Sequence, residues 1–442
     1  MIFASINHHA PEKIALQDRL QTVCYGDLNA EIANRAEQLS KVSTLAIALD
    51  NSVEWVLWDL AAMQAGVVCI PLPPFFSPQQ TAHTLSHAAV SHIVSAEGLL
   101  ATGIQQPVTL PETTAKVTFT SGTTGQPKGV CLPQSAMENV AHSIEQVLGP
   151  DFVGTHMCIL PLAVLLENVA GVYAALIAGC SIRLTSLTEF GQNYEQIHAL
   201  IAENQPTSII LVPEVLRILL AQIAQKGPLQ SLKFIAVGGS KTDANLILLA
   251  RKMGLPVYEG YGLSECASVV SLNTPDNDQP GSVGKLLPHV QATVEDGEIR
   301  IQDPGFLGYI GQSSASSFNT EDLGALDENG FLSITGRKKN VLITSYGRNI
   351  SPEWVEASLL CQPEIAQAVV YGDAQPHLSA LIVPVSETAN IQQSIIKANQ
   401  GLPEYAHIMD IRVVEPFTLS NGLLTGTGRP RREKILERFN SL

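Results

Sequence analysis

Residues 118–130 read Thr-Phe-Thr-Ser-Gly-Thr-Thr-Gly-Gln-Pro-Lys-Gly-Val. The ten residues that begin at Thr120 contain four hydroxyl side chains and three glycines. Glycines let backbone N–H groups approach a bound anion, hydroxyl groups donate hydrogen bonds to it, and a lysine adds positive charge. The stretch therefore predicts a phosphate-binding loop after a short strand. It is not a Walker A loop, in which the lysine directly precedes Ser or Thr, because Lys128 lies between Pro127 and Gly129.

The segments around this loop alternate between strand and helix patterns. The alternation predicts parallel sheets that are covered by helices, because parallel strands need crossover connections. Predicted strands lie at 44–49, 67–71, 92–94, 208–212, 234–237 and 256–258, and predicted helices at 28–39 and 53–65. The most apolar stretch, 169–182, is shorter than the roughly 20 residues of a membrane span and is predicted to be a buried helix.

Beyond about residue 285 the pattern changes to hairpins. Asp296-Gly297 and Asn329-Gly330 each stand between strand-like segments, which favours tight turns. From about residue 338 the pattern is α+β, with Ser351 and Pro352 as a helix start, strands at 368–371, 380–384 and 411–414, and a helix at 431–439. The predicted fold class is α/β. A large N-terminal domain (1–336) of parallel αβ subdomains with a β-rich subdomain precedes a small mobile C-terminal domain (337–442).

The composition bounds the class of protein. The 442 residues are 45% hydrophobic and 15% charged, as in an ordered globular chain, and the formal charge of −15 argues against a nucleic-acid partner. No two of the seven cysteines lie within ten residues of each other, which indicates reduced cysteines of a cytoplasmic protein and no zinc motif. The eleven histidines are unclustered apart from His8 and His9, which are predicted to face solvent. No signal peptide is expected from the first residues.

The stretch 120–129 closely resembles the phosphate-loop signature of the AMP-forming adenylating superfamily, which includes acyl-CoA synthetases, adenylation domains of peptide synthetases and luciferases. In that family the loop holds the β- and γ-phosphates of ATP while a carboxylate attacks the α-phosphorus. The resemblance implies this role for Thr120, Ser121, Gly122, Thr123, Thr124, Gly125 and Lys128.

Two further segments resemble motifs of the same family. The family's Gly-Gly-small segment borders the nucleotide, and it corresponds here to Gly238, Gly239 and Ser240. The segment 261–265 reads Tyr-Gly-Leu-Ser-Glu and resembles the family's Tyr-Gly-x-Thr-Glu. By this resemblance Tyr261 and Gly262 meet the adenine, Ser264 donates to a phosphate and Glu265 binds Mg²⁺. A core position for Tyr261 is the alternative.

The later motifs follow in the family's order. Thr320-Glu321-Asp322 resembles Thr-Gly-Asp, and the resemblance implies that Asp322 binds the ribose hydroxyls. Gly336-Arg337 resembles the Gly-Arg motif at the domain junction, which places Arg337 on the ribose and Lys339 at the hinge. The alternatives are a solvated carboxylate in a hairpin and a basic surface turn. Gly347 lies where a family glycine lets a pantetheine thiol approach.

The sequence departs from the family at three places. Residues 160–168 resemble a segment of long-chain acyl-CoA synthetases, but Val164 replaces its His and Asn168 its Arg. Gln134 stands where a His often follows the phosphate loop. Arg429 stands at the family's C-terminal catalytic lysine, and it keeps the positive charge and can bind an oxyanion through two donors. Lys434 is the alternative cation, and we favour Arg429.

The resemblance implies an enzyme that converts a carboxylic acid and ATP·Mg²⁺ to acyl-AMP and pyrophosphate. The acyl group then passes to the thiol of CoA or of a carrier-protein phosphopantetheine. The motifs are most similar to those of long-chain fatty acyl-CoA synthetases, and Leu165, Leu166 and Val169 either line an acyl pocket or face the core. An acyl-carrier-protein ligase, an aryl-acid adenylating enzyme and a catalytically weakened nucleotide- or acyl-binding protein remain alternatives.

Overall fold

The computed structural model describes residues 2–104, 108–120, 127–191, 194–312, 316–425 and 428–440. The chain divides into two compact units. Unit 1 comprises residues 1–240, 248–291 and 301–318, and unit 2 comprises residues 241–247, 292–300 and 319–442. The predicted boundary at 336/337 differs from this division and stays a prediction.

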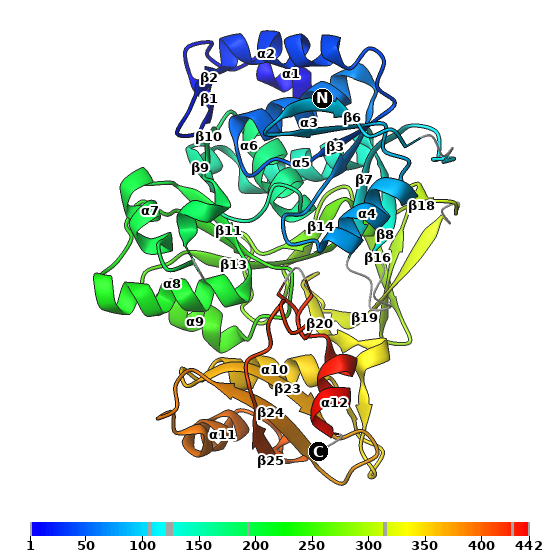
Figure 1. The fold of residues 1–442 in the computed structure, drawn as a ribbon. Helices are drawn as coiled ribbons and strands as arrows, with labels where there is room; N and C mark the ends of the chain where they lie inside the picture. The colour runs from blue at the N-terminus through cyan, green and yellow to red at the C-terminus, as the bar shows by residue number, and fades with distance from the viewer. Residues whose placement is uncertain are drawn as a thin grey trace. The chain divides into compact units, whose positions relative to one another are not determined.

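The described part of unit 1 contains a sheet of nine strands (Figure 1). Its middle strands are parallel, as predicted, and antiparallel strands complete both edges. The order is β15 (Lys285–Leu286), β14 (Ser268–Leu272), β13 (Val257–Leu263), β12 (Phe234–Val237), β11 (Ser208–Leu211), β9 (Thr155–Cys158), β10 (Ser181–Leu184), β1 (Ile14–Gln17) and β2 (Thr22–Cys24). Helices α7 (Ile197–Asn204) and α8 (Pro213–Lys226) lie together beside β11 (Figure 1).

A second sheet of unit 1 carries the predicted phosphate loop. Its order is β18 (Gly308–Tyr309), β8 (Lys128–Pro133), β7 (Thr114–Thr120), β4 (Val68–Pro71), β3 (Thr44–Ile47), β5 (His92–Ser95) and β6 (Gly98–Ala101). The strands β7 and β8 form an antiparallel hairpin, and β18 adds to its outer edge, where Gly308 lies opposite Cys131. The helix α4 (Pro78–His87) lies beside this hairpin (Figure 1).

The core of unit 1 contains helices that are apolar on nearly every side and helices that bury a single face. Helix α3 (Val53–Ala65) buries most of its residues, as its run of Trp, Val, Leu and Ala requires. Helices α2 (Tyr25–Gln38) and α5 (Gln134–Leu148) bury one face each. A π-helix η2 (Leu166–Tyr173) continues into α6 (Ala174–Ala178). The short α1 (Ile2–Ile6) and α9 (Ala244–Lys252) complete the described α-helices of residues 2–291.

The apolar stretch 169–182 corrects one prediction. Its first ten residues are helical, but the helix ends at Gly179, whose φ of 76° is left-handed, and β10 begins at Ser181. Glycine adopts this conformation without the steric cost of a Cβ, so it ends the helix inside an apolar run. His9 is a second correction. It is not a solvent-facing residue, because its ring packs 4.7 Å from Tyr25 and its Nε2 lies 3.0 Å from the Leu176 carbonyl oxygen.

Unit 2 holds the predicted hairpins and the α+β segment. A four-stranded sheet of β16 (Gln291–Glu295), β17 (Glu298–Gln302), β19 (Ser317–Leu326) and β20 (Leu332–Arg337) lies mostly in this unit, with both Asx-Gly turns at the predicted places. A two-stranded ladder of β21 (Leu342–Ile343) and β22 (Asn349–Ile350) follows. The sheet β23 (Ile365–Tyr371), β24 (Leu378–Pro384) and β25 (Ile408–Val413) packs with α10 (Pro352–Leu360), α11 (Ile391–Gln400) and α12 (Arg432–Asn440).

A local signal explains where α10 begins. Ser351 caps α10 because its side chain accepts a hydrogen bond from the Trp354 backbone N–H, as predicted.

All seven cysteines are free. Among the described residues, every helix falls short of the length and apolar character that a membrane span requires.

Candidate functional site

The predicted phosphate loop is the connection of the β7–β8 hairpin. Thr120 at the end of β7 pairs with Lys128 at the start of β8. Thr120 is half-buried and the Lys128 side chain is exposed. Ser121, Gly122, Thr123, Thr124 and Gly125 lie outside the described residues.

Tyr309 brings the predicted metal ligand and the loop lysine together. Its hydroxyl donates to Oε1 of Glu265 over 2.8 Å, and the Lys128 Nζ lies 5.5 Å from the centre of its ring. The ring therefore supports the ammonium group, and the hydroxyl fixes one carboxylate oxygen. No local motif marks Tyr309, which reaches Glu265 because β18 pairs with β8 (Tyr309 opposite Val130).

These groups fit a magnesium–nucleotide complex. Magnesium is usually bound by one or two carboxylates together with substrate phosphates. Within the described part of the chain, Oε2 of Glu265 has no protein hydrogen-bond partner, while Oε1 is oriented by Tyr309. The donor set is thus a positioned carboxylate beside a lysine at the base of the loop.

The two nucleotide motifs of unit 1 lie at the carboxyl ends of neighbouring strands. Gly238, Gly239 and Ser240 follow β12, and Tyr261 lies near the end of the parallel strand β13. Ligands of parallel sheets bind at this edge. Tyr261 is half-buried rather than part of the core, and Ser264 and Glu265 form a short 3₁₀ turn, η5 (Ser264–Cys266), after the strand.

Gly262 is required by the close approach of two strands. A Cβ at this position would lie 1.7 Å from the Ser268 carbonyl oxygen. Every other amino acid would push β13 and β14 apart next to Tyr261. The glycine of the Tyr-Gly motif therefore has a packing reason that does not depend on a ligand.

Unit 2 holds the predicted ribose pair. The Arg337 Nε donates to Oδ1 of Asp322 over 2.8 Å, because the two residues face each other across β19 and β20. Asp322 is only 5% exposed, and its backbone N–H donates to the Thr320 hydroxyl over 3.1 Å. The Thr320 hydroxyl in turn donates to the Ile299 carbonyl. The hydroxyl thus fixes the backbone that presents the Asp322 carboxylate.

Between Thr320 and Asp322, Glu321 takes the place of the family's glycine. Its φ is 59°, in the left-handed region that favours glycine. Its carboxylate lies 3.7 Å from the Nζ of the predicted hinge residue Lys339. Gly347 also has a positive φ, 72°, in the turn that its N–H closes on the Thr344 carbonyl, and its predicted role toward a thiol stays a prediction.

Arg429 lies on a turn near the C-terminus. Its N–H donates to the Thr425 hydroxyl over 3.0 Å, its carbonyl accepts from the Thr425 N–H over 2.7 Å, and its side chain is exposed. Lys434 is exposed on α12. The predicted site residues therefore divide between the units. Unit 1 holds Thr120, Lys128, Gly238, Gly239, Ser240, Tyr261, Gly262, Ser264 and Glu265, and unit 2 holds Asp322, Arg337, Lys339, Gly347 and Arg429.

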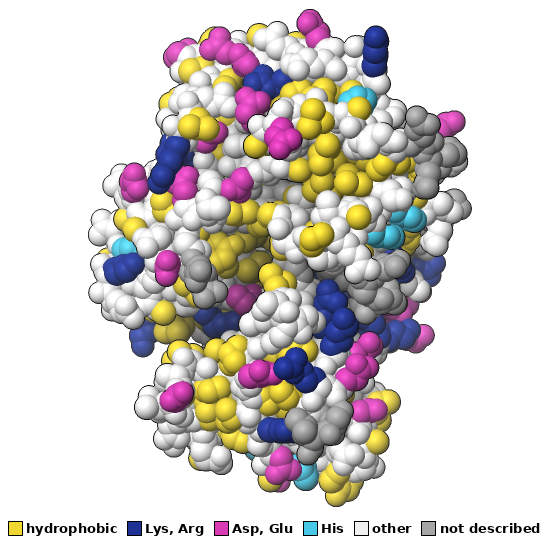
Figure 2. All heavy atoms as spheres, in the orientation of Figure 1, with side chains coloured by type: hydrophobic (Ala, Val, Ile, Leu, Met, Phe, Trp, Pro, Cys, Tyr) yellow, Lys and Arg dark blue, Asp and Glu magenta, His cyan; other side chains and the backbone are white. Residues whose placement is uncertain are grey.

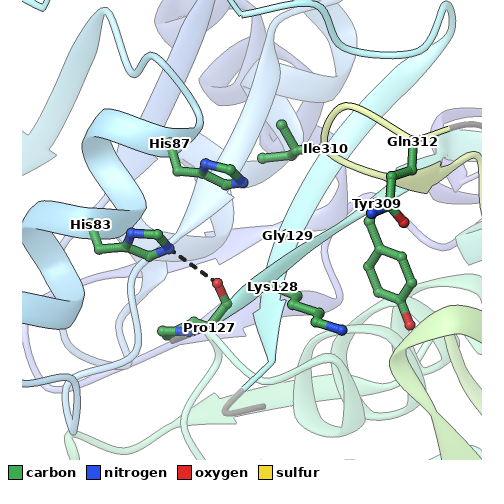
Figure 3. A pocket seen from close by; sticks show the side chains of 8 residues that line it. All are labelled: His83, His87, Pro127, Lys128, Gly129, Tyr309, Ile310 and Gln312. Carbon is green, nitrogen blue, oxygen red and sulfur yellow. Dashed lines mark hydrogen bonds between the residues drawn. The ribbon is translucent and has the colours of Figure 1, made fainter. Parts of the chain in front are cut away.

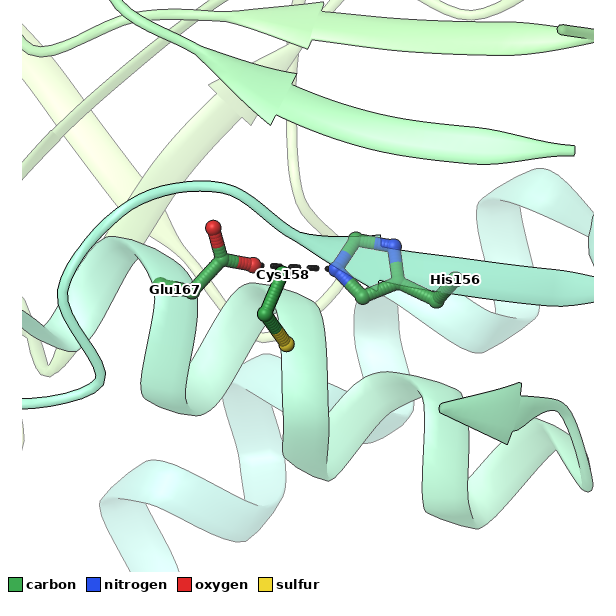
Figure 4. Close-up of side chains that lie close together, drawn as sticks. All are labelled: His156, Cys158 and Glu167. Atoms are coloured by element: carbon green, nitrogen blue, oxygen red, sulfur yellow. Dashed lines mark hydrogen bonds and ion pairs between the residues drawn. The ribbon is translucent and has the colours of Figure 1, made fainter. Parts of the chain in front are cut away.

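A buried histidine–glutamate pair, which the sequence reading missed, orders the segment 159–168 (Figure 4). The His156 Nε2 lies 3.0 Å from Oε1 of Glu167, and both side chains are buried. The other glutamate oxygen accepts from the N–H groups of Ile159 and Leu160. Burial and the nearby Glu167 raise the pKa of the Cys158 thiol well above its usual range. Because both carboxylate oxygens of Glu167 take part in hydrogen bonds within the protein, we interpret this cluster as one that stabilises the fold.

The same segment shows which apolar residues belong to the core. Leu165 and Val169 are buried in the main apolar cluster of unit 1. Leu166 is half-buried, and its Cδ2 would lie 4.0 Å from a Cβ at Gly239. Val164 is also half-buried. Of the three predicted pocket residues, Leu166 is thus the one beside the predicted nucleotide segment.

Comparisons with known proteins agree with this arrangement. The family described as "AMP-binding enzyme" matches residues 3–316, and "AMP-binding enzyme C-terminal domain" matches residues 339–442. The long-chain-fatty-acid–CoA ligase FadD15 of Mycobacterium bovis is 26% identical over 98% of this chain and 94% of its own length. The 2-succinylbenzoate–CoA ligase of Bacillus velezensis is 28% identical, with 83% of each chain covered.

A solved structure shows the same fold. The o-succinylbenzoate CoA synthetase MenE of Bacillus subtilis, in complex with its acyl-adenylate intermediate, superposes with a TM-score of 0.81 at 23% identity. The match covers 98% of this chain and 97% of that chain. The predicted fold class, parallel αβ layers with a smaller C-terminal part, is confirmed.

Proposed function

Because the chain belongs to the AMP-binding enzyme family, we propose that it activates a carboxylic acid with ATP and passes the acyl group to the thiol of CoA. The observation that carries this proposal is the cluster of Lys128, Tyr309 and Glu265 at the base of the phosphate hairpin. Bound Mg²⁺ supplies positive charge to the phosphate oxygens. The relatives whose names mention CoA ligases support the same reaction class.

In this proposal the protein positions groups rather than attacking. The substrate carboxylate is the nucleophile, so no activated Ser or Cys is needed. Lys128 and Thr120 would bind the departing phosphates, and Glu265 would hold the metal in the orientation that Tyr309 sets. From unit 2, the Asp322 carboxylate would accept hydrogen bonds from the ribose hydroxyls, as the resemblance implies. Arg429 would supply a positive charge that binds an oxyanion. We also propose that residues 337–442 move about Lys339 between the half-reactions.

The acid is proposed to be apolar, with a fatty acid as the first candidate. The motif resemblance and the FadD15 similarity support a fatty acid. The similarity to a 2-succinylbenzoate–CoA ligase supports an aryl acid as the second candidate. A carrier-protein phosphopantetheine is the alternative acceptor. Seven free cysteines and the use of ATP are consistent with a cytoplasmic enzyme.

The test is pyrophosphate release with ATP, Mg²⁺ and a panel of fatty acids of graded length and aryl acids, each with CoA and with holo carrier protein. We expect release with one class of acid, and a loss of at least about 100-fold in Lys128→Ala and Glu265→Gln. Lys226→Ala, which removes another exposed lysine of unit 1, is the matched control. ATP binding without release for every acid would instead favour a nucleotide-binding protein.

A further inference from the structure

A pocket opens beside the phosphate hairpin, on the side of β8 that faces α4 (Figure 3). Its volume is about 320 Å³. The lining residues come from α4, from β8 and the residue before it, and from β18 and the segment that follows it. They are His83, His87, Pro127, Lys128, Gly129, Tyr309, Ile310 and Gln312. All of them belong to unit 1.

Two histidines form one wall of this pocket. His83 and His87 lie four residues apart on α4, so they share a helix face, and their rings stack with centroids 5.2 Å apart. Both rings lie in T-shaped arrangements with the Phe119 ring of β7, with centroids 6.4 and 6.2 Å apart. The sequence reading treated these histidines as unclustered, which is wrong. Figure 2 shows histidine at the surface over the part of the molecule where α4 lies, so solvent reaches this wall.

The histidine wall is attached to the phosphate loop. The His83 Nε2 lies 3.2 Å from the Pro127 carbonyl oxygen, and Pro127 directly precedes Lys128. With Nε2 donating to this carbonyl, the neutral ring keeps Nδ1 as an acceptor, and a proton there adds a charge and a second donor. Protonation would therefore turn the wall into a donor surface for an anion.

The charges of the pocket suit an anion. Its lining contains the Lys128 ammonium, two imidazoles and an amide from Gln312. None of the eight lining residues is a carboxylate, although the chain as a whole carries a formal charge of −15. The nearby carboxylate of Glu265 is held by the Tyr309 hydroxyl. A local positive site on an acidic protein attracts and retains small anions.

We propose that this pocket is a binding site for inorganic pyrophosphate, which it receives as the anion leaves the phosphate loop past Lys128. The proposal rests on the proposed function, because pyrophosphate is the product of that reaction. Among the eight described lining residues, Lys128 is the one with a permanent positive charge, and it starts β8 at the end of the loop. It would pass the anion from the loop to His83 and His87.

The histidines make this binding depend on pH. Partial burial, and then the neighbouring His83, lower the pKa of His87. Among the described residues that line the pocket, the other titratable groups are Lys128 from β8 and Tyr309 from β18, and Phe119 of β7 adds no charge beside the rings. An anion favours the protonated rings, so binding takes up protons and strengthens as the pH falls.

Calorimetric titration of the whole protein with pyrophosphate tests the proposal without turnover. We expect tighter binding at about pH 6 than at about pH 8, and a loss of roughly tenfold at the lower pH in the double variant His83→Ala/His87→Ala. His87→Asn keeps a polar side chain at this position and should weaken the pH dependence, because only His83 can then take up a proton. His142→Ala, which removes an exposed histidine of α5, is the matched control.

Three outcomes would overturn the proposal. Unchanged pyrophosphate affinity in both histidine variants is the first. An equal rise of the KM for ATP and of the pyrophosphate inhibition constant is the second, because the pocket would then be part of the ATP site. Orthophosphate binding as tightly as pyrophosphate is the third. Histidine-dependent pyrophosphate binding in a protein that adenylates no acid would refute the proposed function and leave the anion site standing.

Discussion

The guanidinium of Arg432 lies 2.6 Å from the carboxylate of Glu356, and it joins the start of α12 to α10. The same carboxylate oxygen accepts from the Val370 N–H over 2.6 Å, and Arg432 also donates to the Val370 carbonyl. Arg429 lies three residues before Arg432. The pair therefore fixes the chain next to the turn that presents Arg429.

Glu356→Gln should remove a pH dependence of stability. Burial raises the pKa of Glu356 from 4.5 to about 7, against the opposing effect of Arg432. The folded state then holds a proton that the unfolded state releases, so this group's stabilisation is full below about pH 4.5 and is lost as the pH rises to about 7. We expect the stability difference between wild type and Glu356→Gln to change by on the order of 2 to 3 kcal/mol over this range.

Urea unfolding at a series of pH values measures this difference. Glu433→Gln, which changes an exposed glutamate of α12, should follow the wild type at every pH. If the free energies of unfolding of wild type and Glu356→Gln change with pH in parallel, Glu356 has the same pKa in the folded and unfolded states, and the prediction is wrong.

Tyr309→Phe should weaken the use of Mg²⁺ while leaving the ring beneath Lys128. The hydroxyl that orients Glu265 is lost, and loss of a group that orients a metal ligand typically costs about 10-fold or more in metal affinity. The Mg²⁺ concentration that gives half-maximal pyrophosphate release should rise accordingly. Tyr258→Phe, which removes the hydroxyl of a tyrosine on β13, is the control. If the dependence of pyrophosphate release on the Mg²⁺ concentration is the same in Tyr309→Phe as in wild type, Tyr309 does not position the metal ligand.

Glu321→Gly should stabilise the protein by about 0.5 to 1 kcal/mol. The left-handed φ of 59° costs a non-glycine residue about 1 to 2 kcal/mol, and the greater freedom of glycine in the unfolded chain offsets part of that gain. The exposed contact with Lys339 contributes little. Glu321→Ala removes the same contact without relieving the backbone, so it should be no more stable than wild type in urea. If Glu321→Gly is less stable toward urea than Glu321→Ala, the backbone at residue 321 is not strained.

Lys116→Met should destabilise unit 1 by about 3 to 5 kcal/mol, because it leaves a buried carboxylate without its cation. The Lys116 Nζ lies 2.8 Å from Asp59, and both side chains are 1% exposed. Asn168 and Tyr173 donate to the same carboxylate. The double variant Asp59→Leu/Lys116→Met should recover part of the loss. Thermal unfolding compares the three proteins, and a single variant as stable as wild type would exclude the charge pair as a stabilising feature.

The Lys116 contacts join three segments that lie far apart in the sequence. The Lys116 ammonium of β7 contacts both Asn168 and Asp59. The sequence analysis did not predict these contacts, because residues 59, 116 and 168 meet only when α3, β7 and η2 pack together.

The features that the sequence determined are those whose cause lies within a few residues. The Asx-Gly turns and the Ser351 cap act on their own backbone, so their positions could be predicted. Even the Asp322–Arg337 pair lies within one hairpin, although the register of β19 and β20 shifts between Leu323 and Gly324.

The tertiary structure alone decided the features that join distant segments. Tyr309 reaches Glu265 because β18 pairs with β8, and His83 reaches Pro127 because α4 packs beside that hairpin. His156 and Glu167 meet in the core between β9 and η2. Each contact depends on the order of strands in a sheet and on the burial of whole helix faces, which are sums over many weak interactions. No single local pattern records such a sum, and so the sequence revealed the loop while the fold revealed what surrounds it.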